Sequence, residues 1–252
     1  AADVNIRKDS GDTALTMAAT SGSLKLVKYL IERGARVPTG DNKSDTLMEN
    51  AVLSGSLDLV KYLREVLHPD PMRTPAARTK LLMGAAESGS LALTKYFLDM
   101  PGTSVNLTDD SGNTPLMSAA HSGSLALMQY LITQGADVNP RDEDGNTPLL
   151  KMFSNLDKAS DEDIAFIKYL IKKGADVNRA DYAGETPLMK AVKARLVNLS
   201  KYLIAQGAEE VVLEILGALF GVHDFGLELL ELRGDVALGR LDGLLAHPLL
   251  RH

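Results

Sequence analysis

The chain has 252 residues, of which 45% are hydrophobic and 24% charged, an ordinary composition for a folded protein. It has no cysteine, which excludes disulfides, thiolate metal sites and a cysteine nucleophile. The net charge of −6 and the isoelectric point near 5.4 argue against nucleic-acid binding, and no apolar run approaches the roughly 20 residues that a membrane span needs.

The first residues match the ends of later stretches. Ala1-Ala2-Asp3-Val4-Asn5 is in register with residues 135–139 and 174–178, which both read Gly-Ala-Asp-Val-Asn. We therefore interpret residues 1–5 as the end of a repeated unit whose beginning is missing. Two explanations stay open: a cut inside a longer array, or removal of a signal peptide at a small-residue site. The second favours an exported or periplasmic protein over a cytoplasmic one.

A period of about 33 residues organises the chain. Ser-Gly-Ser-Leu begins at Ser21, Ser54, Ser88 and Ser122, with spacings of 33, 34 and 34 residues. A tyrosine recurs in step with it, and six of the seven tyrosines occupy this position: Tyr29, Tyr62, Tyr96, Tyr130, Tyr169 and Tyr202. A fixed period of this length is typical of stacked helical repeats.

Each unit has the signals of two helices. Threonine caps helix N-termini and proline is tolerated at the first helical position, so the Thr-Pro pairs 114–115, 147–148 and 186–187 predict helix starts. The glycine of each Ser-Gly-Ser-Leu ends the first helix, and the serine after it can cap the second. Further glycines are expected to end second helices in a left-handed conformation: Gly34, Gly135, Gly174 and Gly207.

The elements Thr-Pro-Leu, Ala-Ala, Gly-Ser-Leu and Gly-Ala-Asp-Val-Asn occur together and in this order over residues 1–208. In these motifs the chain resembles the ankyrin-repeat family. The resemblance implies an all-α solenoid of antiparallel helix pairs with hairpin-like fingers projecting to one side. It also implies that fingers and first helices form a concave face for a folded protein. We expect six units, at about 8–40, 41–74, 75–108, 109–141, 142–180 and 181–208.

Two segments depart from the repeated pattern. In the second unit Leu67 replaces the closing glycine, and the proline-rich stretch 69–75 predicts a remodelled finger. Lys80 stands one period before Thr114, so a lysine is expected in place of the capping threonine. The fifth unit is six residues longer; Ser160 and Asp163 predict a capping box for its second helix, with 154–159 as an exposed loop. Tolerated drift is the alternative explanation for both segments.

Residues 209–252 differ from the repeats in composition. They contain thirteen leucines but no Lys, Ser, Thr, Asn, Gln, Tyr or Met. We predict a degenerate C-terminal cap that covers the last unit, since repeat stacks need such caps. An appended segment of other origin is the alternative.

Nothing in the sequence indicates catalysis or a cofactor. The five histidines are scattered, and no glycine-rich phosphate loop is present. The acidic clusters 109–110 and 142–144 lack the spacing and closing glutamate of a calcium loop, and aspartate and glycine are common in tight turns. We therefore predict a non-enzyme without metal, cofactor or small-molecule substrate.

Two further series of residues suit packing better than binding. Met83, Met117, Leu150 and Met189 recur at one first-helix position. They predict packing between units, with an adaptable apolar floor for a partner as the alternative. The repeated tyrosines are expected to lie half-buried on the second helices.

Charge distinguishes the expected fingers. The finger at 68–80 is basic, whereas those at 109–111 and 142–144 and the loop 157–163 are acidic. Such a rim orients a charged partner more than it adds affinity, and an ordinary solvated rim is the alternative. The candidate partner-binding residues are Arg73, Arg78, Lys80, Asp109, Asp110, Asn113, His121, Asp142, Glu143, Asp144, Asp157 and Asp161.

We predict a monomeric module that binds a folded protein, with neither nucleic acid nor membrane as partner. The favoured hypothesis is an inhibitor or immunity protein that masks an enzyme, because irregular fingers suit a single target. In this role it would resemble the stand-alone ankyrin proteins with which bacteria neutralise their own cell-wall-directed hydrolases. The alternatives are an adaptor or exported effector that tethers a host protein, and an enzyme with a metal site in the acidic fingers.

Overall fold

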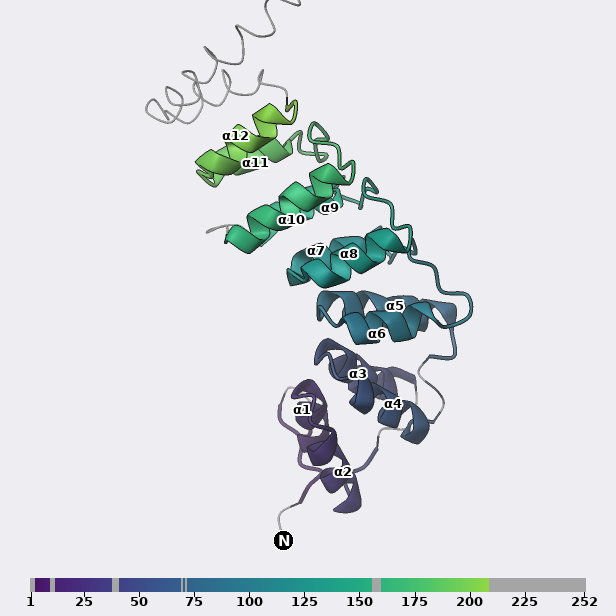
Figure 1. Ribbon diagram of the computed structural model, residues 1–252. Helices are drawn as coiled ribbons and strands as arrows, with labels where there is room; N and C mark the ends of the chain where they lie inside the picture. Colours follow the sequence, from purple (N-terminus) through teal and green to yellow (C-terminus); the bar gives the residue numbers. More distant parts are fainter. Residues whose placement is uncertain are drawn as a thin grey trace, which may run out of the picture. The chain divides into compact units, whose positions relative to one another are not determined.

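The computed structural model describes residues 3–9, 12–37, 41–68, 70, 72–155 and 160–208, without the side chains of 41–45 and 155. These residues form twelve α-helices, one 3-10 helix and no strand, so the predicted all-α class is confirmed (Figure 1). The described residues divide into two compact units, one within 1–176 together with 180–184, and the other within 177–179 together with 185–208. The tail 209–252 lies outside the described residues, and so do Asp157 and the rest of the 156–159 segment.

Helices of the first compact unit come in pairs. The pairs are α1 (Ala14–Thr20) with α2 (Leu24–Glu32), α3 (Asp41–Leu53) with α4 (Leu57–Val66), α5 (Pro75–Glu87) with α6 (Leu91–Leu98), α7 (Pro115–Ser122) with α8 (Leu125–Thr133), and α9 (Pro148–Lys151) with α10 (Asp161–Lys172). The first helices pack on one another in the order α1, α3, α5, α7 and α9. The second helices α2 and α4 pack together, as do α6 and α8. The pairs therefore stack in chain order, as Figure 1 shows.

The predicted caps account for most helix ends. Thr114 and Thr147 accept hydrogen bonds from Met117 N and Leu150 N, and a proline follows each of them at the first helical position. The serines Ser23, Ser56 and Ser90 cap the second helices in the same way. Ser124 occupies the N-cap of α8 but makes no side-chain cap bond. The four glycines predicted to be left-handed have φ between 88° and 95°.

The fifth pair agrees with the prediction at the start of its second helix but not at the end of its first. Ser160 and Asp163 form the expected capping box at the start of α10. The expectation of an exposed loop from residue 154 is wrong at its first two residues. A 3-10 helix, η1 (Met152–Asn155), continues α9 through them.

The prediction that Lys80 replaces a capping threonine is wrong. The first helix of the third pair starts six residues earlier, where Thr74 accepts a hydrogen bond from Ala77 N and Pro75 takes the first helical position. Helix α5 therefore has 13 residues, and Lys80 lies inside it. Pro75, counted above with the remodelled finger, begins this helix because its missing N–H has no helical partner to lose.

Small and apolar side chains fill the interior of the stack. Ala18, Ala51, Ala85 and Ala119 stand at one first-helix position and are buried, which lets neighbouring helices approach closely. The methionine and leucine series is also buried at Met83, Met117 and Leu150, in agreement with packing between units. These three side chains therefore offer little surface to a partner.

Asparagines join the ends of successive units. Asn106 Nδ2 donates to Gly135 O at 3.1 Å, and its Oδ1 accepts from Asp137 N at 2.9 Å. Asn139 makes the same two bonds to Gly174 O and Asp176 N. Because each amide satisfies two backbone groups of the following unit, it fixes the register between units.

Lysine and tyrosine side chains alternate along the second helices. Lys28 lies over the ring of Tyr62, Lys61 over Tyr96 and Lys95 over Tyr130, with Nζ-to-centroid distances of 4.9, 5.8 and 4.9 Å. These three tyrosines are half-buried, as predicted, but the prediction is wrong for Tyr29, which is 49% exposed. The contacts are cation–π interactions, and each one links a unit to the next.

The second compact unit contains α11 (Pro187–Lys193) and α12 (Val197–Ala205), which pack on each other. Thr186 caps α11, and Pro187 follows it as predicted. Asn178 Nδ2 donates to Gly207 O at 3.0 Å, which ties the residues before α11 to the end of α12. Glu185 forms ion pairs with Lys190 and Lys193.

Candidate protein-interaction surface

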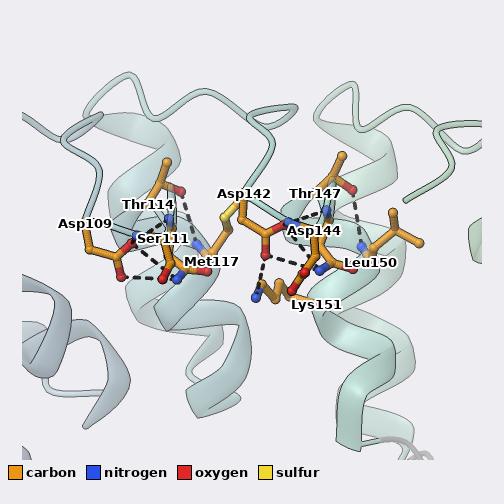
Figure 2. A network of polar contacts seen from close by, with 11 residues as sticks. Asp109, Ser111, Thr114, Met117, Asp142, Asp144, Thr147, Leu150 and Lys151 are labelled. Atoms are coloured by element: carbon orange, nitrogen blue, oxygen red, sulfur yellow. Dashed lines mark hydrogen bonds and ion pairs between the residues drawn. The ribbon is translucent and has the colours of Figure 1, made fainter. Parts of the chain in front are cut away.

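The two acidic fingers before α7 and α9 are built on the same turn. Asp109 Oδ1 accepts hydrogen bonds from Ser111 N at 3.0 Å and Asn113 N at 2.8 Å. Asp142 Oδ1 accepts from Asp144 N and Asn146 N at 3.0 and 2.7 Å (Figure 2). An aspartate that bonds the backbone two residues ahead imitates a turn, so these two carboxylates hold the fingers in shape.

Asp142 has an additional partner. Its Oδ2 lies 2.6 Å from Lys151 Nζ of α9, and the residue is only 5% exposed. Burial by itself raises the pKa of Asp142, but hydrogen bonds from Lys151 and Asn146 and the lysine charge outweigh it, so the pKa lies below its ordinary value. This carboxylate is therefore ionised at neutral pH and faces inward.

Backbone hydrogen bonds join three successive fingers into what we call the finger row, residues 109–113, 142–146 and 180–184. Glu143 N donates to Ser111 O at 2.9 Å, and Tyr182 N donates to Asp144 O at 2.8 Å. The row therefore behaves as one connected edge, not as three separate loops.

Arg141 reinforces the last step of the finger row. Its Nη2 donates to Ala180 O at 2.8 Å, and its guanidinium lies 4.6 Å from the centre of the Tyr182 ring. Gly145 lies beside this contact with φ of 80°, where an added Cβ would come within 2.6 Å of Arg141 Nη2 and 2.9 Å of the tyrosine ring. The close approach therefore requires glycine.

The outward surface of the finger row is acidic with one aromatic ring. Asp110, Glu143 and Asp144 are exposed, and Tyr182 is 69% exposed. Of the predicted binding residues in this region, Asp109 and Asn113 are half-buried and bond each other, and Asp142 is buried. The acidic row predicted from the sequence is thus divided into inward turn-forming carboxylates and outward ones.

The predicted basic finger is not one surface. Arg73 is exposed before α5, whereas Arg78 and Lys80 belong to α5 itself. Arg78 Nη1 donates to Met72 O at 2.9 Å, so this half-buried guanidinium holds the preceding turn. Lys80 Nζ pairs with Glu49 of α3 at 2.7 Å. Two of these three cations therefore serve contacts within the stack.

The remaining predicted residues lie apart from the finger row along the chain. His121 is exposed in the last turn of α7, and Asp161 is exposed in the first turn of α10. Three acidic residues in that first turn, Asp161, Glu162 and Asp163, suit the positive end of the helix dipole.

Sequence reasoning missed three residues of this surface: Lys151, Arg141 and Tyr182. One signal was available for Lys151, which stands four residues after the capping Thr147, where the preceding unit has Ser118. Tyr182 is the one tyrosine outside the repeated series, and that exception was a second signal.

The described residues contain no group of three or more histidine, aspartate or glutamate side chains placed to hold a metal ion. Among the same residues, no helix has the length and apolar character needed to cross a bilayer.

Comparison with known families agrees with this architecture. A family model described as ankyrin repeats in three copies matches residues 1–74 and 82–155, which is more than half of the chain, and a second, described as ankyrin repeats in many copies, matches residues 156–204. A search among curated proteins gives no match. From these matches and the stacked helix pairs, we conclude that the chain belongs to the ankyrin-repeat family, whose repeats form protein–protein interaction modules.

Proposed function

We propose that this module binds a folded protein through the finger row and masks that protein's active surface, as an inhibitor or immunity protein does. The observation that carries the proposal is the set of outward carboxylates Asp110, Glu143 and Asp144 on a connected, hydrogen-bonded edge. Masking an enzyme requires coverage and no chemistry, so a rigid interaction module is sufficient for it. A cell-wall-directed hydrolase with a basic rim around its active site is the kind of partner we envisage.

Rigidity of the finger row supports binding at low entropic cost. The side chains of Asp109 and Asp142 already hold two of the turns, and the inter-finger bonds at Glu143 N and Tyr182 N connect all three. A surface that is ordered before association loses less conformational freedom when a partner arrives.

The composition of the row suggests how a partner is recognised. Three outward carboxylates steer and orient a basic surface, with a modest effect on affinity. Tyr182 can supply the buried contact, since exposed aromatic residues often carry much of the binding energy at interfaces. We therefore expect association to slow as ionic strength rises, because salt screens the exposed carboxylates.

The test compares capture by the parent chain with capture by a triple variant, Asp110→Asn, Glu143→Gln and Asp144→Asn. Both are immobilised and exposed to envelope and cytosolic fractions of the source organism. We expect an enzyme that the parent retains and the variant does not, and we expect its activity to fall when the parent is added.

A second triple variant controls for net charge. Asp58→Asn on α4, with Glu32→Gln on α2 and Glu65→Gln on α4, removes three exposed carboxylates from second helices instead. It should capture the same enzyme as the parent. Equal capture by all three proteins would show that the finger row is not the binding surface. Capture without loss of enzyme activity would reject masking and favour the adaptor role.

A further inference from the structure

The fifth finger, residues 142–146, contains a pair of residues with a chemistry of its own, Asp144-Gly145. The equivalent pairs in the other two fingers of the row are Ser111-Gly112 and Ala183-Gly184, which lack the carboxylate. The backbone nitrogen that follows an aspartate can attack its side-chain carboxyl, and glycine favours this attack because it has no Cβ to hinder the approach. The sequence has one other such pair, Asp242-Gly243, which lies outside the described residues.

The reaction open to this pair is isomerisation through a cyclic imide. Gly145 N attacks Asp144 Cγ, and one carboxylate oxygen leaves as water with one proton from the amide and one from solvent. Water then opens the ring and returns the proton. Attack of water at Cγ restores aspartate, whereas attack at the backbone carbonyl carbon gives isoaspartate, in which the main chain runs through Cβ and Cγ of Asp144. Water is therefore the only reactant that the isomerisation needs.

Two features of the folded finger oppose this reaction. Gly145 N donates a hydrogen bond to Asp142 O at 2.9 Å, so the attacking nitrogen is already engaged. Gly145 is also buried between the guanidinium of Arg141 and the ring of Tyr182, where an added Cβ would have no room. Ring closure requires the nitrogen to reach Cγ in a defined geometry, and a peptide held in this way is not free to turn toward it.

Isomerisation would in turn damage the finger row. Asp144 N donates to Asp142 Oδ1 at 3.0 Å, and Asp144 O accepts from Tyr182 N at 2.8 Å. The side chain of Asp144 is exposed, so water reaches its carboxylate. In isoaspartate one more carbon separates the nitrogen from the main-chain carbonyl, which displaces the oxygen that Tyr182 N uses. The bond between these two fingers therefore depends on an unmodified Asp144.

We propose that Asp144-Gly145 is a site of spontaneous isomerisation, which the closed fifth finger suppresses and which opening of that finger allows. The closed state is the one described above, with Gly145 held by Asp142, Arg141 and Tyr182. A finger can open locally while the rest of a stack stays folded. Isoaspartate formed during such an opening prevents the finger from closing as before, so the modification is a one-way record of opening. The proposal is independent of the function proposed for the finger row.

The test follows the full chain in water labelled with heavy oxygen, because each opening of the imide by water leaves a labelled oxygen in the product. Mass spectrometry after digestion separates the peptide that contains Asp144 from the one that contains Asp242. We expect label to enter at Asp144 at least about tenfold more slowly in the folded chain than in the chain unfolded in urea. Asp144→Glu is the matched control: it keeps the charge, but its longer side chain would have to close a larger ring, and it should take up almost no label.

Tyr182→Ala tests the role of the closed finger. It removes the ring beside Gly145, and since Tyr182 is 69% exposed the chain should stay folded and take up label several-fold faster than the parent. Val27→Ala in α2 is the comparison, because it weakens a buried site in the first helix pair and should leave the rate near that of the parent. Circular dichroism checks that both variants are folded.

Three results would overturn the proposal. Equal labelling of the folded and unfolded chains would mean that the turn gives no protection. A rise in Val27→Ala as large as that in Tyr182→Ala would mean that the reaction follows unfolding of the whole stack. Isomerised chains, separated from the parent by ion exchange, should lose hydrogen-exchange protection at Tyr182 N, and unchanged protection there would exclude a one-way record.

Discussion

The fourth and fifth fingers, residues 109–113 and 142–146, form the same type of turn, but only the fifth finger has an ion pair to the helix that follows it. In both, an aspartate accepts two backbone hydrogen bonds and one asparagine amide (Figure 2). Asp142 also pairs with Lys151 and is buried, whereas Asp109 is half-buried and its unit carries Ser118 at the corresponding helix position. The same acidic motif thus serves as a turn in one finger and as a link between turn and helix in the other.

This comparison shows that the number of acidic residues on a rim overstates the charge that a partner meets. Of the residues predicted to bind, Asp142 is neutralised internally and Asp109 is committed to its own turn. The charge offered outward by the two fingers comes from Asp110, Glu143 and Asp144. Mutations of the inward carboxylates should therefore lower the stability of the fold, whereas mutations of the outward carboxylates should weaken binding.

Asp142→Ala should have the largest effect on folding. It removes the acceptor for two backbone N–H groups of the turn, and it leaves the half-buried Lys151 without its partner. The loss of one member of a buried ion pair typically costs about 3–5 kcal/mol. Asp109→Ala removes the equivalent two turn hydrogen bonds but breaks no ion pair, so we expect it to cost about 1–2 kcal/mol of stability. Urea unfolding followed by circular dichroism measures both, and equal losses would show that the ion pair contributes nothing.

Lys151→Met should have a smaller effect than Asp142→Ala. The carboxylate loses its cation but keeps its donors from Asp144 N, Asn146 N and the Asn146 amide, so about 1–3 kcal/mol is expected. A double-mutant cycle with Asp142→Asn isolates the coupling between the two side chains. Additive losses in that cycle would contradict a direct interaction.

Acidification should remove the stability that ionised Asp142 contributes to the fifth finger. The pKa of Asp142 is lowered in the folded state, so the stability it contributes is present above the unfolded-state value of about 3.9 and is lost as pH falls through the lower folded value. The stability difference between the parent and Lys151→Met should therefore be constant near neutral pH and shrink at acidic pH. A difference that grows as the pH falls would mean the opposite sign of the pKa shift.

How much of this could be predicted depends on whether a feature is local in sequence. The caps at Thr114, Thr147 and Ser160 need only a few neighbouring residues, and all three are confirmed. The period measured from Thr114 predicts a helix start at Lys80, which is wrong. The local Thr74-Pro75 pair, six residues earlier, is the signal that marks the actual start of α5.

Contacts between units were harder to predict. A lysine precedes five of the six repeated tyrosines in the sequence. The sequence does not show, however, that Lys28 reaches Tyr62 of the next repeat instead of a residue in its own helix. The same holds for Asp142 and Lys151, nine residues apart. Such pairs depend on where side chains point once a turn and a helix have packed, which periodicity does not specify.

The smallest expected effect is a gain in stability from Ser118→Lys, and it tests the comparison of the two fingers most directly. Ser118 is half-buried on α7, four residues after the capping Thr114, just as Lys151 stands four residues after Thr147. A lysine there should reach Asp109 and recreate the ion pair of the fifth finger. Because Asp109 is more exposed than Asp142, we expect only about 0.5–1 kcal/mol of added stability.

Ser118→Met is the matched control, since it adds a similar apolar stem without the charge. If the gain comes from the ion pair, Ser118→Met lacks it, and adding Asp109→Asn to Ser118→Lys abolishes it. A gain of the same size in Ser118→Met would instead assign it to apolar packing near Met83, whose sulfur lies 3.9 Å from Ser118 Oγ. The difference between the two fingers would then arise from the shape of the helix surface beneath them, and Lys151 would owe its effect to its aliphatic stem as much as to its charge.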